Sequence, residues 1–333
     1  MLQASSLLPA PPTPILPGSP IVYDVVHTTT YSYSEPVPVC HNEVHLMPRT
    51  TASQRVLSHS LSVKPLPFRM SNSLDYFSNH VGIFSLEEVH EKLVVTAASR
   101  VEIVPPTPWE NRVSRPWESV RDHLACDPGP EALFAGQFRY DSPMVRANPR
   151  LAEWAGQSFR PGRPWAEALV DLTHRIHSSF AYDPAATTTS TPVEEVFDLK
   201  RGVCQDFAHL QIACLRSLGL AARYVSGYLC NLGPPPQGEP GSAVEQGMVG
   251  ADASHAWLSC WGGEAGWLDV DPTNKCVVGG LHVTVAWGRD YGDVCPIKGV
   301  YVGGGHHSME VAVRVIRATG DEARSTDQPL VRT

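Results

Sequence analysis

A change in the hydrophobic pattern near residue 108 constrains the fold of this chain more than any other feature. Before it, from Ile21 to about Pro105, runs such as YDVVHTTTYSYS and KLVVTAASRVEIV alternate apolar with polar residues and are rich in β-branched and aromatic types. Pro, Asn and Ser separate these runs, which is typical of antiparallel strands. After it, helical and then mixed patterns follow. We therefore predict an α+β fold, in which an antiparallel β-domain of the sandwich or barrel type precedes a mixed core.

The predicted domain boundaries follow the same change of pattern. Residues 21–108 form the β-sandwich-like domain, and residues 109–320 form a second domain that opens with helical segments. Residues 1–20, a Pro-rich leader, and residues 321–333 are predicted to be disordered, because they have little apolar surface to bury. A signal peptide is the alternative for the leader. It is disfavoured because no Lys or Arg precedes the apolar stretch, which prolines interrupt.

Composition narrows the classes of function. A net charge of -8 argues against a nucleic-acid partner, which would select for basic patches. The sequence has no run of eighteen apolar residues, so no membrane span is expected. None of the eight cysteines forms a C-x-x-C pair, and no EF-hand loop occurs, so we expect no metal and no cofactor. Reduced thiols and a cytoplasmic location are the default expectation, and the oligomeric state is not indicated.

The segment RGVCQDFAHL places a cysteine, Cys204, between a glycine-bearing turn and a predicted helix. The helix runs from about Cys204 to Leu218, and Gly219 fits its C-cap. Unpaired N–H groups at a helix start favour the thiolate, which is the reactive form of cysteine. Cys204 is therefore a candidate nucleophile. The alternative is a small buried hydrophobe, which is how we interpret Cys214 on the apolar stripe of the same helix.

A histidine and an aspartate follow on two predicted strands, SHAWLSCW and GWLDVDP. A hairpin centred on Gly263 sets His255 opposite Asp271, with Cβ atoms about 5 Å apart. If the centre shifts by one position, His255 faces Asp269 instead, and bulges near the glycines alter either pairing. A cysteine nucleophile needs a histidine to take its proton and a third group to orient the imidazole. The alternatives are a structural histidine and an aspartate that forms a turn before Pro272.

Three further polar features are ambiguous. His209 lies about 140° around the helix from Cys204, which favours a packing or hydrogen-bonding role over that of a second base. Asp206 fits either the rim of a site or a solvated acid in the first helical turn. The tail segment GRDYGDV, residues 288–294, fits two roles equally. It either lines a cleft or acts as a polar staple that joins the sheet to the core.

Three motifs together resemble the transglutaminase-like superfamily: GVCQDFAHLQIACLRSLGLAARYVSGYL, GADASHAWLSCW and GWLDVDPTN. The N-terminal strands resemble the β-domain that precedes this core in bacterial members, and HVTVAWGRDYGDVCPIKGVYVGGGHHSMEVAVRV resembles their usual ending. The resemblance covers nearly the whole chain after about residue 20. It implies a papain-like core in which a helix bearing the cysteine packs on an antiparallel sheet.

The resemblance also implies roles for the three residues. Cys204 resembles the nucleophile, His255 the general base and acid, and Asp271 the orienting carboxylate, which favours Asp271 over Asp269. The backbone N–H of Cys204 is the natural first oxyanion donor, and a second donor is not identified. Residues 109–320 are thereby expected to be the catalytic domain.

The implied reaction is acyl transfer at a peptide or protein amide, including a Gln side chain, through a thioester on Cys204. Hydrolysis of the protease or amidase type is slightly favoured over transfer to an amine, because bacterial proteins of this architecture are often described as candidate cysteine proteases. A non-catalytic binding module is the alternative, and it is disfavoured because Cys204, His255 and Asp271 are all retained. The N-terminal β-domain either docks a partner, gates the substrate or simply covers the catalytic domain.

Overall fold

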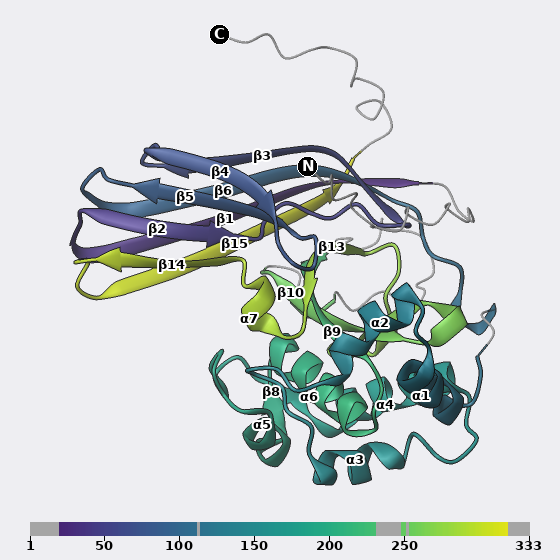
Figure 1. Ribbon diagram of the computed structural model, residues 1–333. Coiled ribbons are helices and arrows are strands. Elements are labelled where there is room, and N and C mark those ends of the chain that lie inside the picture. The colour runs from purple at the N-terminus through teal and green to yellow at the C-terminus, as the bar shows by residue number, and fades with distance from the viewer. Residues whose placement is uncertain (1–19, 112–113, 231–247, 251–252, 319–333) are drawn as a thin grey trace, which may run out of the picture.

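The computed structural model describes residues 20–111, 114–230, 248–250 and 253–318. The predicted leader (apart from Pro20), the predicted tail and the Pro/Gly segment at 231–247 lie outside these residues. The rest confirms the α+β prediction, with a β-sandwich above a core in which helices cover a sheet (Figure 1). Among the described residues, no helix has the length and apolar character needed to cross a bilayer.

Two four-stranded antiparallel sheets build the sandwich, in the strand orders β15-β1-β6-β3 and β14-β2-β5-β4. Their apolar faces meet in one cluster, to which Leu93 and Val95 of β6 and Phe84 and Leu86 of β5 contribute. The predicted period-two pattern is clearest in β6, where buried residues alternate with partly exposed ones from Leu93 to its end. The strands are β1 (Ile21–Val37), β2 (Val39–Val44), β3 (Gln54–Lys64), β4 (Arg69–Leu74), β5 (His80–Leu86), β6 (His90–Ile103), β14 (Ile297–Val302) and β15 (His307–Arg317).

The predicted boundary between the domains is wrong at the C-terminal end. We assigned residues 109–320 to the second domain, but β14 pairs with β2 and β15 pairs with β1 over eleven residue pairs. Figure 1 shows these two strands returning to the sandwich beside strands from the start of the chain. The reason is that β1 would otherwise leave one long edge unpaired, and the C-terminal strand closes that edge.

The core has a five-stranded antiparallel sheet in the order β12-β11-β10-β9-β13. Helix α6 packs on β9 and β10 and also contacts α3, α4 and α5, so it lies between the sheet and the outer helices. The core strands are β9 (Ala222–Leu229), β10 (His255–Trp261), β11 (Trp267–Asp271), β12 (Cys276–Val277) and β13 (His282–Gly288), with a small parallel pair β7 (Ala181–Tyr182) and β8 (Arg201–Gly202).

Helices begin after the change of pattern near residue 108, as predicted. In α4 an apolar stripe is buried, formed by Trp165, Leu169, Leu172 and Ile176, and Pro164 precedes the first turn. The α-helices are α1 (Trp117–Cys126), α2 (Pro130–Gly136), α3 (Pro149–Gly156), α4 (Trp165–Ser179), α5 (Val193–Leu199), α6 (Cys204–Ser217) and α7 (Tyr291–Val294). Short 3-10 turns occur at η1 (Trp109–Asn111), η2 (Gln137–Arg139) and η3 (Gly263–Ala265).

Side-chain amides from the sandwich cover the outer edge of β13. Gln54 donates to the Thr284 carbonyl and accepts from the Thr284 N–H, so its amide imitates a paired strand. Asn79 does the same at Trp287, donating to the carbonyl at 2.8 Å and accepting from the N–H at 3.0 Å. These bonds satisfy backbone groups that would otherwise be buried without partners. The sandwich is therefore joined to the core through specific hydrogen bonds.

A stack of rings and guanidinium groups reinforces the same junction. Arg49, from the β2–β3 connection, lies 3.6 Å from the ring centroid of Trp287, and Arg223 of β9 lies 3.7 Å from that ring. Arg223 also lies 4.0 Å from the ring of Trp267. Buried cation–π contacts of this kind are stronger than exposed ones, because water does not compete for the cation.

Replacing Asn79 with alanine should lower the stability of the whole chain. Asn79 is fully buried, and the change leaves the N–H and carbonyl of Trp287 without their partners. Orphaned buried groups of this kind predict a loss of roughly 2–4 kcal/mol in the free energy of unfolding. Urea unfolding measures it, with the exposed Asn72→Ala as the matched control. Equal midpoints for the two variants would contradict the role assigned to Asn79.

Candidate active site

Cys204 is the first residue of α6, as predicted. Asp206 closes the first turn by accepting from the Val203 N–H at 2.8 Å and from the Thr187 hydroxyl at 2.6 Å. The reading of Asp206 as a solvated acid is therefore wrong, since its side chain is buried. A Cβ atom on Gly202 would lie 2.6 Å from an Asp206 oxygen, so glycine is required before the cysteine. The segment RGVCQD thus encodes a fixed helix entry.

The two cysteines of α6 have different surroundings. Cys204 is partly exposed in the first turn, whereas Cys214 is fully buried in the middle of the helix. Burial raises the pKa of the Cys214 thiol to about 12, which keeps it protonated and inert. Gly219 follows the helix with φ of +82°, which fits the predicted C-cap. The assignment of Cys214 to the core is confirmed.

The predicted register of the β10–β11 hairpin is wrong by two residues. Observed partners are Trp261 with Trp267 and Ser259 with Asp269, because the turn is a longer loop around η3 rather than a tight one at Gly263. A shift of two positions keeps every side chain on its predicted face, since the side-chain period of a strand is also two. His255 therefore still meets Asp271, as a diagonal neighbour instead of a directly opposed one.

The predicted contact between His255 and Asp271 is present. His255 Nε2 lies 2.8 Å from Asp271 Oδ2, and both side chains are buried. Asp269, the alternative partner, instead accepts from the indole N–H of Trp257 at 3.2 Å. The sequence placed Asp269 and Asp271 on one face of the strand. In the structure, Asp271 contacts His255 and Asp269 contacts Trp257.

Asp271 is held by backbone donors of the turn that the sequence indicated before Pro272, and by two side chains that the sequence did not indicate. Its Oδ2 also accepts from Asn274 Nδ2 at 2.8 Å and lies 3.3 Å from His282 Nε2. Its Oδ1 accepts from the backbone N–H groups of Thr273 and Asn274. The turn DPTN therefore fixes the carboxylate through its N–H groups and the Asn274 amide. Strand β13 supplies a second imidazole, that of His282. A carboxylate so fully bonded remains charged and cannot rotate.

The remaining ring nitrogen of His255 is Nδ1, because Nε2 is the one that contacts Asp271. Burial lowers the pKa of His255, whereas Asp271 and then Cys204 raise it, which indicates that Cys204 belongs to the electrostatic surroundings of the ring. Nδ1 has no hydrogen-bond partner of normal geometry among the described residues. The Cys204 thiol and the His255 imidazole therefore form no hydrogen bond in the resting site. Resting catalytic contacts are often long in this way.

In the His255–Asp271 pair, the charge of each partner opposes the effect of burial on the pKa of the other. Burial alone would lower the pKa of His255, but the Asp271 carboxylate and then Cys204 raise it to about 10. Burial alone would raise the pKa of Asp271, but His255 and then His282 hold it well below its ordinary value. The resting pair is therefore imidazolium and carboxylate, so His255 holds a proton that it can donate.

This pair predicts a specific pH dependence of stability. Because the pKa of His255 is raised above its ordinary 6.5, its contribution is complete below pH 6.5 and is lost as the pH rises through about 10. Because the pKa of Asp271 is lowered from 3.8, its contribution is complete above pH 3.8. The melting temperature should therefore fall between pH 6.5 and about 10, and less steeply in His255→Gln. Calorimetric scans of both proteins check this, and parallel slopes would refute it.

Gly250 leaves room beside the imidazole. A Cβ atom at this position would lie 2.7 Å from His255 Nδ1, the ring nitrogen that does not contact Asp271. Gly250→Ala should therefore displace the ring and lower kcat by roughly tenfold or more. Gly266 is the matched control, because it also has a positive φ but nothing lies within 4 Å of its Cβ position. Initial rates on a common substrate compare the two, and equal losses would point to backbone strain alone.

Three tyrosines lie within the electrostatic influence of Cys204, and the sequence pointed to the segment of only one of them, Tyr291. The pKa values of Tyr182, Tyr224 and Tyr291 are raised first by burial, and in each Cys204 adds to the shift. Tyr291 belongs to the segment GRDYGDV, and its N–H donates to Nε2 of the buried His209 at 3.1 Å. The predicted hydrogen-bonding role of His209 is thereby confirmed.

The segment GRDYGDV acts mainly as a polar staple. Arg289 pairs with Asp293 at 2.9 Å, and its carbonyl accepts from the buried Arg216 of α6. Asp290 accepts from the backbone N–H of Met144, which ties the segment to the loop before α3. Of the two predicted roles, the staple is thus observed, and Tyr291 lies within the electrostatic influence of Cys204.

Asp271, Cys276 and His282 also lie close enough to one another to suggest a metal site, with ligand atoms within 4.8 Å. Their chemistry does not fit one. The Asp271 carboxylate is already bonded, since its Oδ1 accepts from the backbone N–H groups of Thr273 and Asn274. A metal would also displace His255 and Asn274 from Asp271 Oδ2. The cluster is better described as a hydrogen-bonded support for His255.

Comparison with known proteins gives consistent matches in sequence and fold. Residues 23–102 match the bacterial transglutaminase-like N-terminal region, and residues 152–272 match the transglutaminase-like superfamily. An uncharacterized protein of Mycobacterium tuberculosis strain H37Rv is 39% identical over 307 residues, which cover 90% of this chain and 94% of that protein. An uncharacterized protein of Mycobacterium leprae is 33% identical over 88% of this chain and 98% of that protein.

Two further matches carry more informative names. The protein-glutamine gamma-glutamyltransferase of Pseudomonas aeruginosa is 35% identical over 155 residues, which span 44% of this chain but 22% of that protein. Among solved structures, a candidate cysteine protease of Cytophaga hutchinsonii has a TM-score of 0.70 at 20% identity, covering 91% of this chain and 93% of that chain. The second match is a likeness in fold.

Proposed function

Because the chain belongs to the transglutaminase-like superfamily, we propose that it catalyses cysteine-dependent acyl transfer at an amide, with water as the favoured acceptor. The observation that carries the proposal is the 2.8 Å contact between His255 Nε2 and Asp271 Oδ2, on a ring whose other side is coupled to Cys204. Nucleophile, proton carrier and orienting carboxylate are the parts that thioester chemistry needs.

In the first half of the reaction, the Cys204 thiolate attacks the carbonyl carbon of the amide. The carbonyl electrons move to oxygen, and the N–H groups at the start of α6, beginning with that of Cys204, stabilise the oxyanion. The imidazolium of His255 then gives its proton to the departing nitrogen as the C–N bond breaks. An amine or ammonia leaves, and the acyl group remains on sulfur as a thioester.

In the second half, His255 is neutral and takes a proton from the incoming nucleophile. That nucleophile attacks the thioester carbon, and the Cys204 thiolate departs. Asp271 keeps the imidazole oriented and stabilises its positive charge in both halves. His282 and Asn274 are positioning residues in this scheme, because they act on the reaction only through Asp271.

Water is favoured over an amine as the acceptor for a physical reason. Cys204 is only partly buried, so we expect water to have access to a thioester formed on it. An enzyme that selects an amine must keep water away from that intermediate. The name of the Cytophaga relative agrees with hydrolysis, while the name of the Pseudomonas relative keeps transfer from Gln to an amine as the second candidate.

A peptide experiment tests the proposal and separates its two branches. The protein is incubated with Gln-bearing peptides, with and without a primary amine, and the products are read by mass, with Cys204→Ala as the control. We expect cleavage or deamidation that the amine barely alters. An amine adduct as the main product would move the assignment to transglutamination. No product from broad peptide and non-protein amide sets would count against catalysis.

A further inference from the structure

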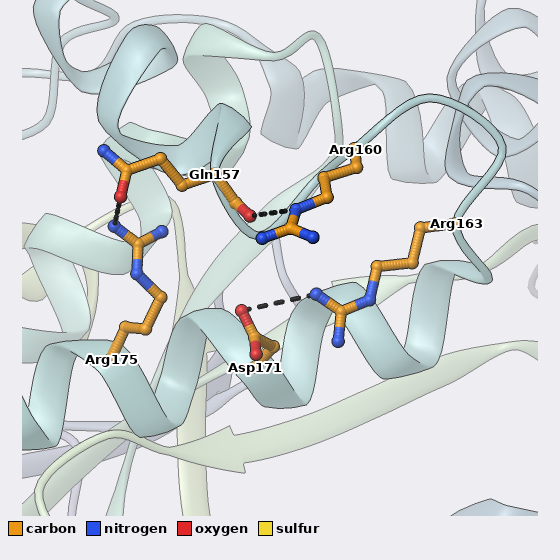
Figure 2. A pocket seen from close by; sticks show the side chains of 5 residues that line it. All are labelled: Gln157, Arg160, Arg163, Asp171 and Arg175. Atoms are coloured by element: carbon orange, nitrogen blue, oxygen red, sulfur yellow. Dashed lines mark hydrogen bonds and ion pairs between the residues drawn. The ribbon is translucent and has the colours of Figure 1, made fainter.

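We propose that a cavity between α3, the turn after it and α4 binds a small phosphate-bearing anion. The cavity has a volume of about 470 Å³, which lies in the range of small-molecule sites. Its lining is Gln157, Arg160, Arg163, Asp171 and Arg175 (Figure 2). None of these residues belongs to the Cys204 site, so the inference is independent of the proposed reaction.

Two of the guanidinium groups are fixed in advance. Arg163 Nη1 donates to the Ser158 carbonyl at 2.9 Å and lies 3.4 Å from Asp171 Oδ2. Arg175 donates to the Trp154 carbonyl and to the Ser158 hydroxyl, and lies 4.4 Å from the centroid of the Trp154 ring. Side chains held in this way lose little conformational freedom when an anion binds.

The third guanidinium supplies unused donors. Arg160 Nε donates to the Gln157 carbonyl at 3.3 Å, and its two terminal nitrogens make no hydrogen bond to any residue that the structure describes. Figure 2 shows this group between Gln157 and Arg163, on the side of the cavity that faces Asp171. Terminal nitrogens of a guanidinium form a planar fork that matches two oxygens of a phosphate.

The charges around the cavity do not balance. Three guanidinium groups face one carboxylate, so the lining is left with two positive charges. Burial lowers the pKa of Arg175, which shows that its charge carries a desolvation cost, and Asp171 offsets only part of it. A ligand with up to two negative charges would neutralise the excess. A phosphate monoester or inorganic phosphate meets this requirement in both charge and shape.

Calorimetric titration of the full chain tests the site, with inorganic phosphate and glycerol 3-phosphate as separate probes at constant ionic strength. Arg160→Gln removes the unused donors and little else, because its one hydrogen bond is to a carbonyl. We expect this variant to bind at least about tenfold more weakly, as for the loss of a charge-assisted hydrogen bond. Arg146→Gln, an exposed arginine away from the lining, is the control and should bind as the wild type does.

The outcomes are distinct. Stronger binding of glycerol 3-phosphate, lost in Arg160→Gln, supports recognition of a phosphate ester, and equal binding of both probes supports recognition of the free oxyanion. Failure of both probes to bind at millimolar concentration overturns the proposal. So does an equal weakening in Arg160→Gln and Arg146→Gln, because it would reflect overall charge rather than a site.

Discussion

Cys204→Ser will abolish amide turnover while leaving the fold intact. The hydroxyl is a far weaker nucleophile than a thiolate, and an imidazolium beside it cannot accept its proton. Loss of a triad nucleophile predicts a drop in kcat on the order of 10⁴ or more. The first turn of α6 should persist, because Asp206 bonds to Val203 and Thr187 and makes no use of the sulfur.

The control for this variant is Cys126→Ser, because Cys126 is exposed and outside the site. It should keep wild-type kinetics, and circular dichroism should show both variants folded. If Cys204→Ser retained more than a few per cent of the wild-type kcat, the thioester mechanism would be excluded.

Asp271→Asn has the second largest expected effect, on both activity and stability. Asp271 Oδ2 is surrounded by nitrogen groups of His255, His282 and Asn274. An amide nitrogen in place of this oxygen cannot accept their hydrogen bonds. The neutral side chain would no longer stabilise the imidazolium or fix its tautomer. A similar change in another catalytic triad lowers kcat by on the order of 10⁴. Loss of one partner in a buried ion pair predicts a destabilisation of roughly 3–5 kcal/mol.

Asp269→Asn is the matched control for Asp271→Asn. It lies two residues away on the same face of β11, and its contact is the indole N–H of Trp257. We expect it to keep most of the activity, since an amide oxygen can still accept that bond. Rates are measured per folded molecule, with the folded fraction taken from denaturant curves. Equal losses of activity in the two variants would remove the special role of Asp271.

Local patterns in the sequence predicted the parts of the site that depend on neighbours along the chain. The glycine turn before Cys204, the length of α6 and the face shared by His255 and Asp271 all follow from short periodicities. The hairpin register did not, because it depends on the length of the loop around η3, and Gly262 and Gly263 fit several turn lengths.

Features set by long-range pairing escaped the sequence reasoning. Nothing local in HSMEVAVRVIR indicates that it pairs with β1, almost three hundred residues earlier in the chain. The sequence did not point to His282, since its contact with Asp271 depends on the order of strands in the sheet. The sequence did not point to Gly250, because the role of this residue is to leave space beside the His255 ring.

The contacts at the domain junction bear on which of the three expected roles the N-terminal sandwich has. Asn79 and Gln54 bind the edge of β13, and β13 carries the His282 that supports Asp271. Of the expected roles for the N-terminal domain, these contacts fit a structural cover that also stabilises the catalytic sheet. The pairing of β14 and β15 with the sandwich ties the end of the chain to the same body.

The rate of alkylation of each cysteine by iodoacetamide, read by mass at about pH 6, tests the central claim most directly. Cys126 is more exposed than Cys204 and serves as the internal reference for an ordinary thiol. If His255 and Asp271 hold Cys204 as a thiolate, Cys204 will react much faster than Cys126, and His255→Ala will remove the difference. A Cys204 that reacts no faster than Cys126 in the wild-type protein would contradict the account.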